Sequence, residues 1–346
     1  MSRLAPPLDA PQHEPAPRPL PLFMGLVREV ATRDPQLAAK ALRGLRAYQA
    51  APRSPPVADS AQAARGEAHL RHCAGTGRPI VLVPSIINPP HVLDLDPGTS
   101  LAAALGQAGR VALVDWGSLA GRRHLDLSGH VRDLLVPLLS RSLSEPPLLV
   151  GYCLGGTLAL AAAALTEVAG VATLAAPWHF SAYPADARSG LARLWQQARP
   201  VAEQLGALPM EVLQAAFWSL DPERVVAKYA SFADLAPDSA GARRFVLLED
   251  WANSGQPLPL PAAHELIEGL FGLDLPGTGK WLDGLPSCNT IHFTAGSDRI
   301  VPPATAAPGA TIACPAGHVG MVAGRSAPLH LHRPLRQWLA AQPRGG

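Results

Sequence analysis

The amino-acid sequence predicts an α/β fold, in which a mostly parallel sheet is flanked by helices and interrupted by a helical cap insertion. Short apolar runs alternate with segments of helical periodicity along most of the chain, which is typical of strands joined by crossover helices. The alternation stops over residues 181–285 and then resumes. We therefore expect an α/β core over residues 67–180 and 286–346, with residues 181–285 as the cap.

Residues 1–66 are expected to form a proline-rich leader and an N-terminal helix ahead of the core. Prolines crowd residues 1–21, residues 22–50 have helical periodicity, and residues 51–65 are a linker rich in proline, serine and alanine. Because no apolar segment precedes the first prolines, we expect no signal peptide and a cytoplasmic location.

Composition excludes several functional classes. The net charge is +2, and no run of basic residues favours nucleic acid. The four cysteines have no CxxC spacing and the twelve histidines form no HExxH pair, so no metal site is expected. The longest apolar stretch, residues 148–171, is interrupted by Gly151, Gly155, Gly156 and Glu167, so we expect no transmembrane helix.

Six apolar runs predict the strands of the sheet. They cover residues 78–85, 109–117, 147–153, 170–177, 290–298 and 310–320. Helical periodicity predicts the helices of the core over residues 100–108, 124–143, 157–170 and 328–341. In the second of these helices Ser128 is the expected N-cap.

The turn after the third predicted strand carries the strongest local signal. A buried strand leads into Gly151-Tyr152-Cys153-Leu154-Gly155, and a helix of small residues follows at once. This is the G-x-S-x-G elbow of the α/β-hydrolase fold with cysteine in the place of serine. Gly151 and Gly155 leave room for the tight turn, and Gly156 lets the helix pack on the sheet. Cys153 is the expected nucleophile; the alternative is a buried structural cysteine.

An acid and a base are expected at later positions of the same fold, where the nucleophile, acid and histidine follow in that order along the chain. Asp298 follows the fifth predicted strand and His318 follows the sixth, so Cys153, Asp298 and His318 form the predicted catalytic triad. The rival acids and bases lie in less suitable places: Asp94, Asp115, His292, His330 and His332.

Two backbone amides are expected to form the oxyanion hole. One belongs to Leu154, the residue after the nucleophile, and the other to the loop after the first predicted strand. We expect the Ile86 amide in this second role, with Ile87 as the alternative.

Five segments of this chain resemble segments of polyhydroxyalkanoate (PHA) synthases and follow in the same order. The likeness is carried by GYCLGGT (151–157), VPSIINPPHVLDLDPGTSL (83–101), VALVDWG (111–117), AGSDRIVP (295–302) and AGHVG (316–320). The resemblance implies an acyltransferase that moves 3-hydroxyacyl groups from a CoA thioester, through an acyl-enzyme on Cys153, to a hydroxyl acceptor. It implies no cofactor, because CoA enters as part of the substrate. One departure is Arg299, where the family usually has histidine after the acid.

The chemistry of cysteine agrees with this interpretation. A thiol that attacks a CoA thioester exchanges one thioester for another, and a hydroxyl can then accept the acyl group. The alternative is a cysteine-dependent hydrolase, either an acyl thioesterase or an intracellular polyester depolymerase; a non-catalytic granule-binding relative is a third. Expected partners are the 3-hydroxyacyl-CoA and a growing polyester, with a homodimer, a partner subunit or a granule surface left open. Aromatic residues of the cap are candidates to line the site: Trp195, Phe217, Trp218 and Phe271.

Overall fold

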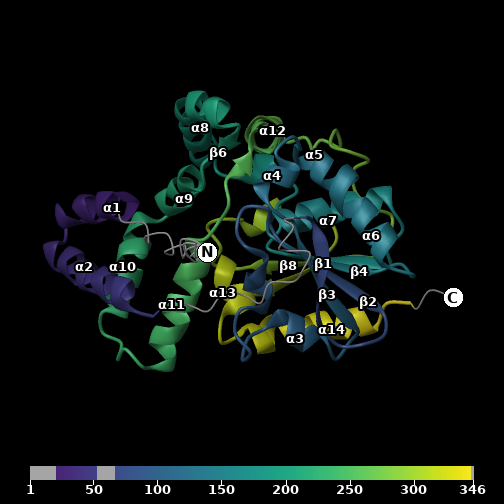
Figure 1. The fold of residues 1–346 in the computed structure, drawn as a ribbon, viewed down its shortest axis with the longest axis horizontal. Coiled ribbons are helices and arrows are strands. Elements are labelled where there is room, and N and C mark those ends of the chain that lie inside the picture. The colour runs from purple at the N-terminus through teal and green to yellow at the C-terminus, as the bar shows by residue number, and fades with distance from the viewer. Residues whose placement is uncertain (1–20, 53–66, 344–346) are drawn as a thin grey trace, which may run out of the picture.

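A seven-stranded sheet forms the centre of the computed structural model, which describes residues 21–52 and 67–343 (Figure 1). The strand order is β1-β3-β2-β4-β5-β8-β9, and every neighbouring pair is parallel except β1 with β3. The strands are β1 (His69–Ala74), β2 (Pro79–Val83), β3 (Arg110–Asp115), β4 (Leu148–Tyr152), β5 (Gly170–Leu174), β8 (Thr290–Ala295) and β9 (Ala310–Cys314). The predicted α/β fold class is therefore confirmed.

The six predicted strands all form, and within the described seven-stranded sheet the sequence missed the edge strand β1. Strands β2, β4 and β5 are buried along their whole length, as expected for the centre of a parallel sheet. By contrast, β1 is mostly half-exposed, and its residues HLRHCA have no continuous apolar run. A strand of this kind takes its conformation from pairing with β3, which local sequence does not record.

Helices cover both faces of the sheet and bury two apolar clusters. One face is covered by α3 (Leu101–Leu105), α13 (His318–Ala323) and α14 (Arg333–Ala340). The helices on the opposite face are α4 (Leu119–Arg122), α5 (Leu127–Gly129), α6 (Val136–Ser142) and α7 (Leu154–Leu165). The predicted N-cap Ser128 is wrong: Asp126 caps α5 by accepting from the Gly129 amide, whereas Ser128 bonds to Glu265.

The segment between β5 and β8 is mostly helical. Its helices are α8 (Ala185–Leu205), α9 (Met210–Ser219), α10 (Pro222–Phe232), α11 (Ala240–Ala252) and α12 (Leu260–His264), which a π-helical turn over Glu265–Gly272 extends. Two short strands, β6 (Ala207–Leu208) and β7 (Leu258–Pro259), pair within it. The boundaries at residues 181 and 285 stay a prediction.

The N-terminal helices pack on this segment, which the sequence did not predict. The helical pattern of residues 22–50 folds as α1 (Pro21–Ala31) and α2 (Pro35–Ala50), separated where Asp34 caps α2. Both helices lie beside α10 and α11 at one end of the molecule, where Phe23, Tyr48 and Tyr229 join a third apolar cluster (Figure 1). A β-carbon on Gly44 would lie 1.8 Å from the Tyr229 carbonyl oxygen, so glycine is required for this contact. The predicted leader falls outside the described residues.

No helix within residues 21–52 and 67–343 combines the length and the apolar character needed to cross a lipid bilayer.

Candidate active site

Cys153 lies at a sharp turn between β4 and α7. Its backbone has φ 55° and ψ −134°, a conformation that residues with a side chain rarely adopt. The Cys153 amide donates to the Leu174 carbonyl at 2.9 Å, and the Gly156 amide donates to the Cys153 carbonyl at 2.9 Å. These bonds hold the strained turn and place the sulfur at the N-terminal end of α7.

The three glycines of the elbow are required by close packing. A β-carbon on Gly151 would lie 2.4 Å from the Gly156 α-carbon, and one on Gly156 would lie 2.4 Å from the Ala176 β-carbon. A β-carbon on Gly155 would lie 2.2 Å from the Val83 carbonyl oxygen. Any side chain at these positions would push α7 away from the sheet or from the loop after β2.

The structure brings His318 and Asp298 together beside this turn. The two side chains are joined by a 2.6 Å hydrogen bond between His318 Nδ1 and Asp298 Oδ2. The other carboxylate oxygen, Oδ1, accepts from the amides of Ile300 at 2.8 Å and Val301 at 2.9 Å. Because the side chain of Asp298 is buried and held at both oxygens, it fixes the orientation of the imidazole.

The imidazole of His318 and the Cys153 side chain line the same pocket. Burial alone lowers the pKa of His318, but negative charge on Cys153 and Asp298, together with their hydrogen bonds, outweighs it and raises the pKa to about 10. The ring of Tyr152 is tilted by 30° from the imidazole plane, with centroids 5.0 Å apart. The three residues predicted as a triad thus meet in one place.

The rival residues have other partners. Asp94 accepts from Ser100 Oγ at 2.7 Å and pairs with Arg71, while His292 bonds to Thr173 inside the sheet. Asp115 accepts from the Gly117 amide at the end of β3. None of these side chains borders the pocket around Cys153, among the residues that the structure describes.

Two amides remain suited to bind an oxyanion beside Cys153. Leu154 is the first residue of α7, so its amide has no acceptor within the helix. The loop after β2 passes close to it, since Gly155 packs against the carbonyls of Val83 and Pro84. In this loop the Ile87 amide donates to Ser85 Oγ at 3.2 Å, whereas the Ile86 amide has no acceptor within the described part of the chain. The Ile86 amide is thus left for the predicted role in the oxyanion hole, which stays a prediction.

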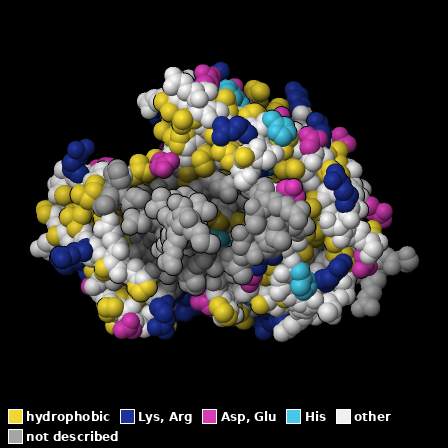
Figure 2. Space-filling view, in the orientation of Figure 1, with side chains coloured by type: hydrophobic (Ala, Val, Ile, Leu, Met, Phe, Trp, Pro, Cys, Tyr) yellow, Lys and Arg dark blue, Asp and Glu magenta, His cyan; other side chains and the backbone are white. Residues whose placement is uncertain are grey.

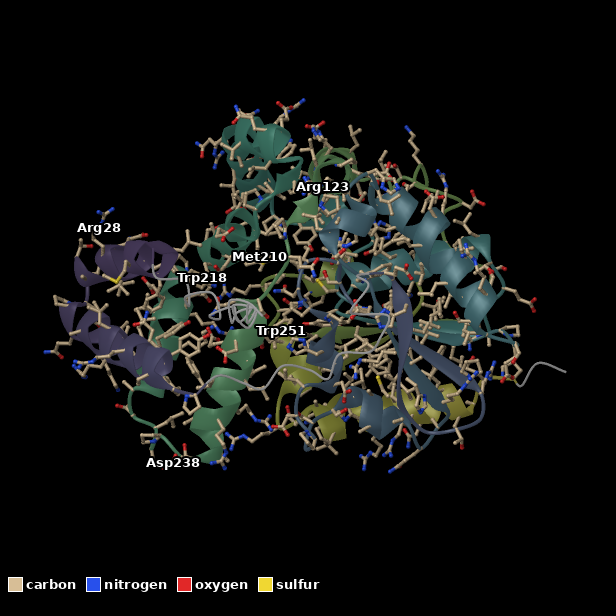
Figure 3. All side chains as sticks on the ribbon, in the orientation of Figure 1. Arg28, Arg123, Met210, Trp218, Asp238 and Trp251 are labelled. Carbon is tan, nitrogen blue, oxygen red and sulfur yellow. The ribbon has the colours of Figure 1, made fainter. Side chains whose placement is uncertain are left out.

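Cys153 and His318 open into a pocket of about 390 Å³ between the core and the cap. Met210 and Trp218 of α9 and Trp251 of α11 border it from the cap side, where Figure 3 labels all three. Of the four aromatic residues predicted to line the site, Phe217 and Trp218 do so. Trp195 bonds instead to Glu268, and Phe271 packs against Phe180 and Tyr183.

The pocket also holds polar residues of the cap that the sequence did not single out. Asp221 pairs with Arg299 of the core at 3.5 Å, and Lys228 pairs with Glu249 at 2.6 Å. Gln214 lines the pocket as well. No motif marks these cap positions, which are brought together only when the cap packs on the core. Outside the pocket, hydrophobic side chains lie over α8, where Val201 and Leu205 are exposed (Figure 2).

Sheet order and site together define an α/β-hydrolase fold. A sharp turn after a central parallel strand carries Cys153, the loop after β8 carries Asp298, and the loop after β9 leads to His318.

Similarity to known proteins agrees with the resemblance found in the sequence. No protein-family model matches the chain. Three curated relatives carry the name poly(3-hydroxyalkanoate) polymerase subunit PhaC. Those of Haloarcula marismortui and Haloferax mediterranei are each 26% identical, over 77% and 78% of this chain, and that of Synechocystis is 31% identical over 50% of it. The resemblance to PHA synthases is confirmed. The chain spans 62%, 60% and 49% of the lengths of these relatives.

The solved structures to which this chain is similar have lower sequence identity than these relatives. A thermophilic esterase from Thermogutta terrifontis is 16% identical, with a TM-score of 0.47 over 79% of this chain and 92% of its own. A structure described among carboxylesterases of Nitrososphaera gargenis is 13% identical, with a TM-score of 0.49 over 82% of this chain and 98% of its own.

Proposed function

We propose that this chain is an acyltransferase of the PHA synthase type, which transfers 3-hydroxyacyl groups from a CoA thioester to a hydroxyl acceptor through an acyl-enzyme on Cys153. The observation that carries the proposal is the hydrogen bond between His318 and Asp298 in the pocket that the elbow residue Cys153 also lines. The similarity to three PhaC polymerase subunits supports the choice of substrate.

The first step forms the acyl-enzyme. The sulfur of Cys153, having given its proton to His318, attacks the thioester carbonyl, and the amides of Leu154 and Ile86 stabilise the oxyanion. When the tetrahedral intermediate collapses, the carbon–sulfur bond to CoA breaks. The CoA sulfur takes the proton from His318 and leaves as a thiol. One thioester replaces another, so this step is close to balanced in free energy.

The second step passes the acyl group to an oxygen. A hydroxyl of the growing polyester or of a second hydroxyacyl unit attacks the Cys153 thioester, and His318 takes the hydroxyl proton. The carbon–sulfur bond to Cys153 breaks, the thiol regains its proton, and an ester is formed. Asp298 holds the imidazole in one tautomer through both steps. These residues need no cofactor for either step.

Exclusion of water distinguishes transfer from hydrolysis. A transferase must keep the acyl-enzyme away from water long enough for a hydroxyl acceptor to arrive. The cap covers the pocket with mainly apolar side chains, among them Met210, Phe217 and Trp251. This lining supports transfer. We place the reaction in the cytoplasm. The proposal includes association of the enzyme with polyester granules or with a partner subunit.

The test uses the purified chain with 3-hydroxybutyryl-CoA. We expect release of CoA thiol together with a rise in turbidity from polymer, and loss of both in Cys153→Ala. The matched control is Cys73→Ala, which removes a half-buried thiol outside the pocket and leaves both signals unchanged. Thiol release with free 3-hydroxybutyrate and no polymer would establish the hydrolase instead. Absence of any Cys153-dependent release with short-chain and longer-chain 3-hydroxyacyl-CoA would refute the proposal.

A further inference from the structure

A chain of four polar side chains connects the N-terminal helix α2 with the pocket. Tyr48 of α2 donates its hydroxyl proton to Asp250 Oδ1 at 2.8 Å. Asn253, just after α11, donates from Nδ2 to the Tyr48 oxygen at 3.3 Å. Gln214 of α9 donates from Nε2 to Asn253 Oδ1. The last of these residues lines the same pocket as Cys153.

The chemistry of the first residue fixes the direction of every bond in this network. The carboxylate of Asp250 can only accept, so the Tyr48 hydroxyl must donate to it. Burial raises the pKa of Tyr48, so this hydroxyl keeps its proton. The Tyr48 oxygen then accepts from the amide nitrogen of Asn253, which turns the Asn253 oxygen toward Gln214. Gln214 must therefore present its nitrogen to Asn253, which leaves its carbonyl oxygen, Oε1, for the pocket.

The surroundings of Gln214 make its Oε1 atom a binding group for a ligand. The side chain is 95% buried, since its exposed fraction is 5%. Within the described residues Oε1 accepts no hydrogen bond, and it is not one of the fully buried atoms without a partner, so it is open to the pocket. The neighbouring Met210 and Phe217 are apolar, so a donor on the occupant of the pocket can bind Oε1 in place of water.

Gln214 lies on the side of α9 that faces the loop after β2. Gln214 lies one helical turn after Met210, on the same side of α9. The Met210 sulfur packs against Gly255, next to the carbonyl oxygen of Ile87. Ile87 adjoins the amide of Ile86, which binds the thioester carbonyl in the proposed mechanism. The charged side chains that the cap contributes to the pocket, such as Lys228, lie on α10 and α11 or at the N-cap of α10, and not on α9.

We propose that Gln214 Oε1 accepts a hydrogen bond from the 3-hydroxyl group of the bound 3-hydroxyacyl thioester, and that Gln214 thereby selects 3-hydroxyacyl over unsubstituted acyl substrates. Tyr48 is a positioning residue, because it orients Gln214 through Asn253 without touching the substrate. This inference rests on the proposed function and assigns a specificity determinant to it.

The experiment compares 3-hydroxybutyryl-CoA with butyryl-CoA, which differs only by the hydroxyl. The quantity measured is the ratio of kcat/KM values for Cys153-dependent release of CoA thiol. We expect the ratio to fall about tenfold in Gln214→Met, through a loss confined to the hydroxylated substrate, because one hydrogen bond of roughly 1.4 kcal/mol corresponds to that factor. Tyr48→Phe should lower the ratio in the same direction, since the Asn253 and Gln214 amides are then free to rotate.

Ser219→Ala is the matched control. It also removes a polar side chain from α9, but the Ser219 hydroxyl bonds to the Ala216 carbonyl and lies outside the pocket and the network, so the ratio should stay unchanged. Tyr48→Phe removes a single oxygen and keeps the inference testable if Gln214→Met fails to fold. An unchanged ratio in both Gln214→Met and Tyr48→Phe would overturn the inference. An equal loss of kcat/KM for both thioesters would also overturn it, because the donor would then lie on the CoA part of the substrate. A wild-type chain that releases no CoA would refute the proposed function itself.

Discussion

Replacing Asp298 by asparagine tests the geometry of the site most directly, because the two side chains have nearly the same shape. Asp298 Oδ1 accepts from two backbone amides, those of Ile300 and Val301, while Oδ2 faces His318 Nδ1 at 2.6 Å. An asparagine can satisfy only one of these two sets. Turning its NH₂ group toward the backbone amides would leave two buried donors unpaired, at about 1–3 kcal/mol each.

The asparagine oxygen is therefore expected to stay with the two amides, which leaves the NH₂ group against His318 Nδ1. Nδ1 must then act as an acceptor, so the imidazole carries its proton on Nε2 and cannot take the proton of Cys153. We expect formation of the acyl-enzyme to slow by about 10³–10⁴-fold. At about 1.4 kcal/mol per factor of ten, this corresponds to roughly 4–5.5 kcal/mol of activation free energy.

The assay is the burst of CoA thiol from 3-hydroxybutyryl-CoA in a rapid-mixing experiment, with circular dichroism to check the fold. Asp115→Asn is the matched control, because Asp115 ends β3, outside the pocket, and should leave the burst unchanged. A burst in Asp298→Asn within tenfold of the wild-type rate, in a protein of native fold, would refute the assignment of Asp298 as the residue that orients His318.

Three further predictions concern the imidazole, the elbow and the N-terminal helices. The pKa of His318 is raised to about 10, so NMR should find this ring protonated between pH 7 and 9. Cys153→Ala should lower the pKa of His318, because it removes a negative neighbour. A titration of His318 near pH 6.5 in the wild type would contradict this prediction. Gly155→Ala should lower the free energy of unfolding by about 1–3 kcal/mol in denaturant titrations, because its β-carbon would lie 2.2 Å from the Val83 carbonyl oxygen, and a change below about 0.5 kcal/mol would argue against the close approach. Gly44→Ala should separate α2 from α10, seen as faster hydrogen exchange in both helices, and unchanged exchange would rule that contact out.

The sequence by itself determined the strands of the parallel sheet and the positions of the three central side chains. Buried parallel strands are short, continuous apolar runs, and the elbow needs glycines at fixed distances from Cys153, so both leave a local pattern. The places of Asp298 and His318 followed from the chain order of the fold. The wrong N-cap prediction also came from reading a local pattern. Ser128 looked like an N-cap, but Asp126 reaches the Gly129 amide and Glu265 from a distant helix takes Ser128.

Only the tertiary structure decided how the cap completes the pocket and how the N-terminal helices pack on the cap. Tyr48, Gln214 and Asn253 are far apart in the chain and belong to no motif, yet their amide and hydroxyl groups meet in one network. The edge strand β1 likewise depends on a distant segment, because it forms by pairing with β3. Periodicity and turn chemistry act over a few residues, whereas the partner of a buried polar group is set by how whole helices pack.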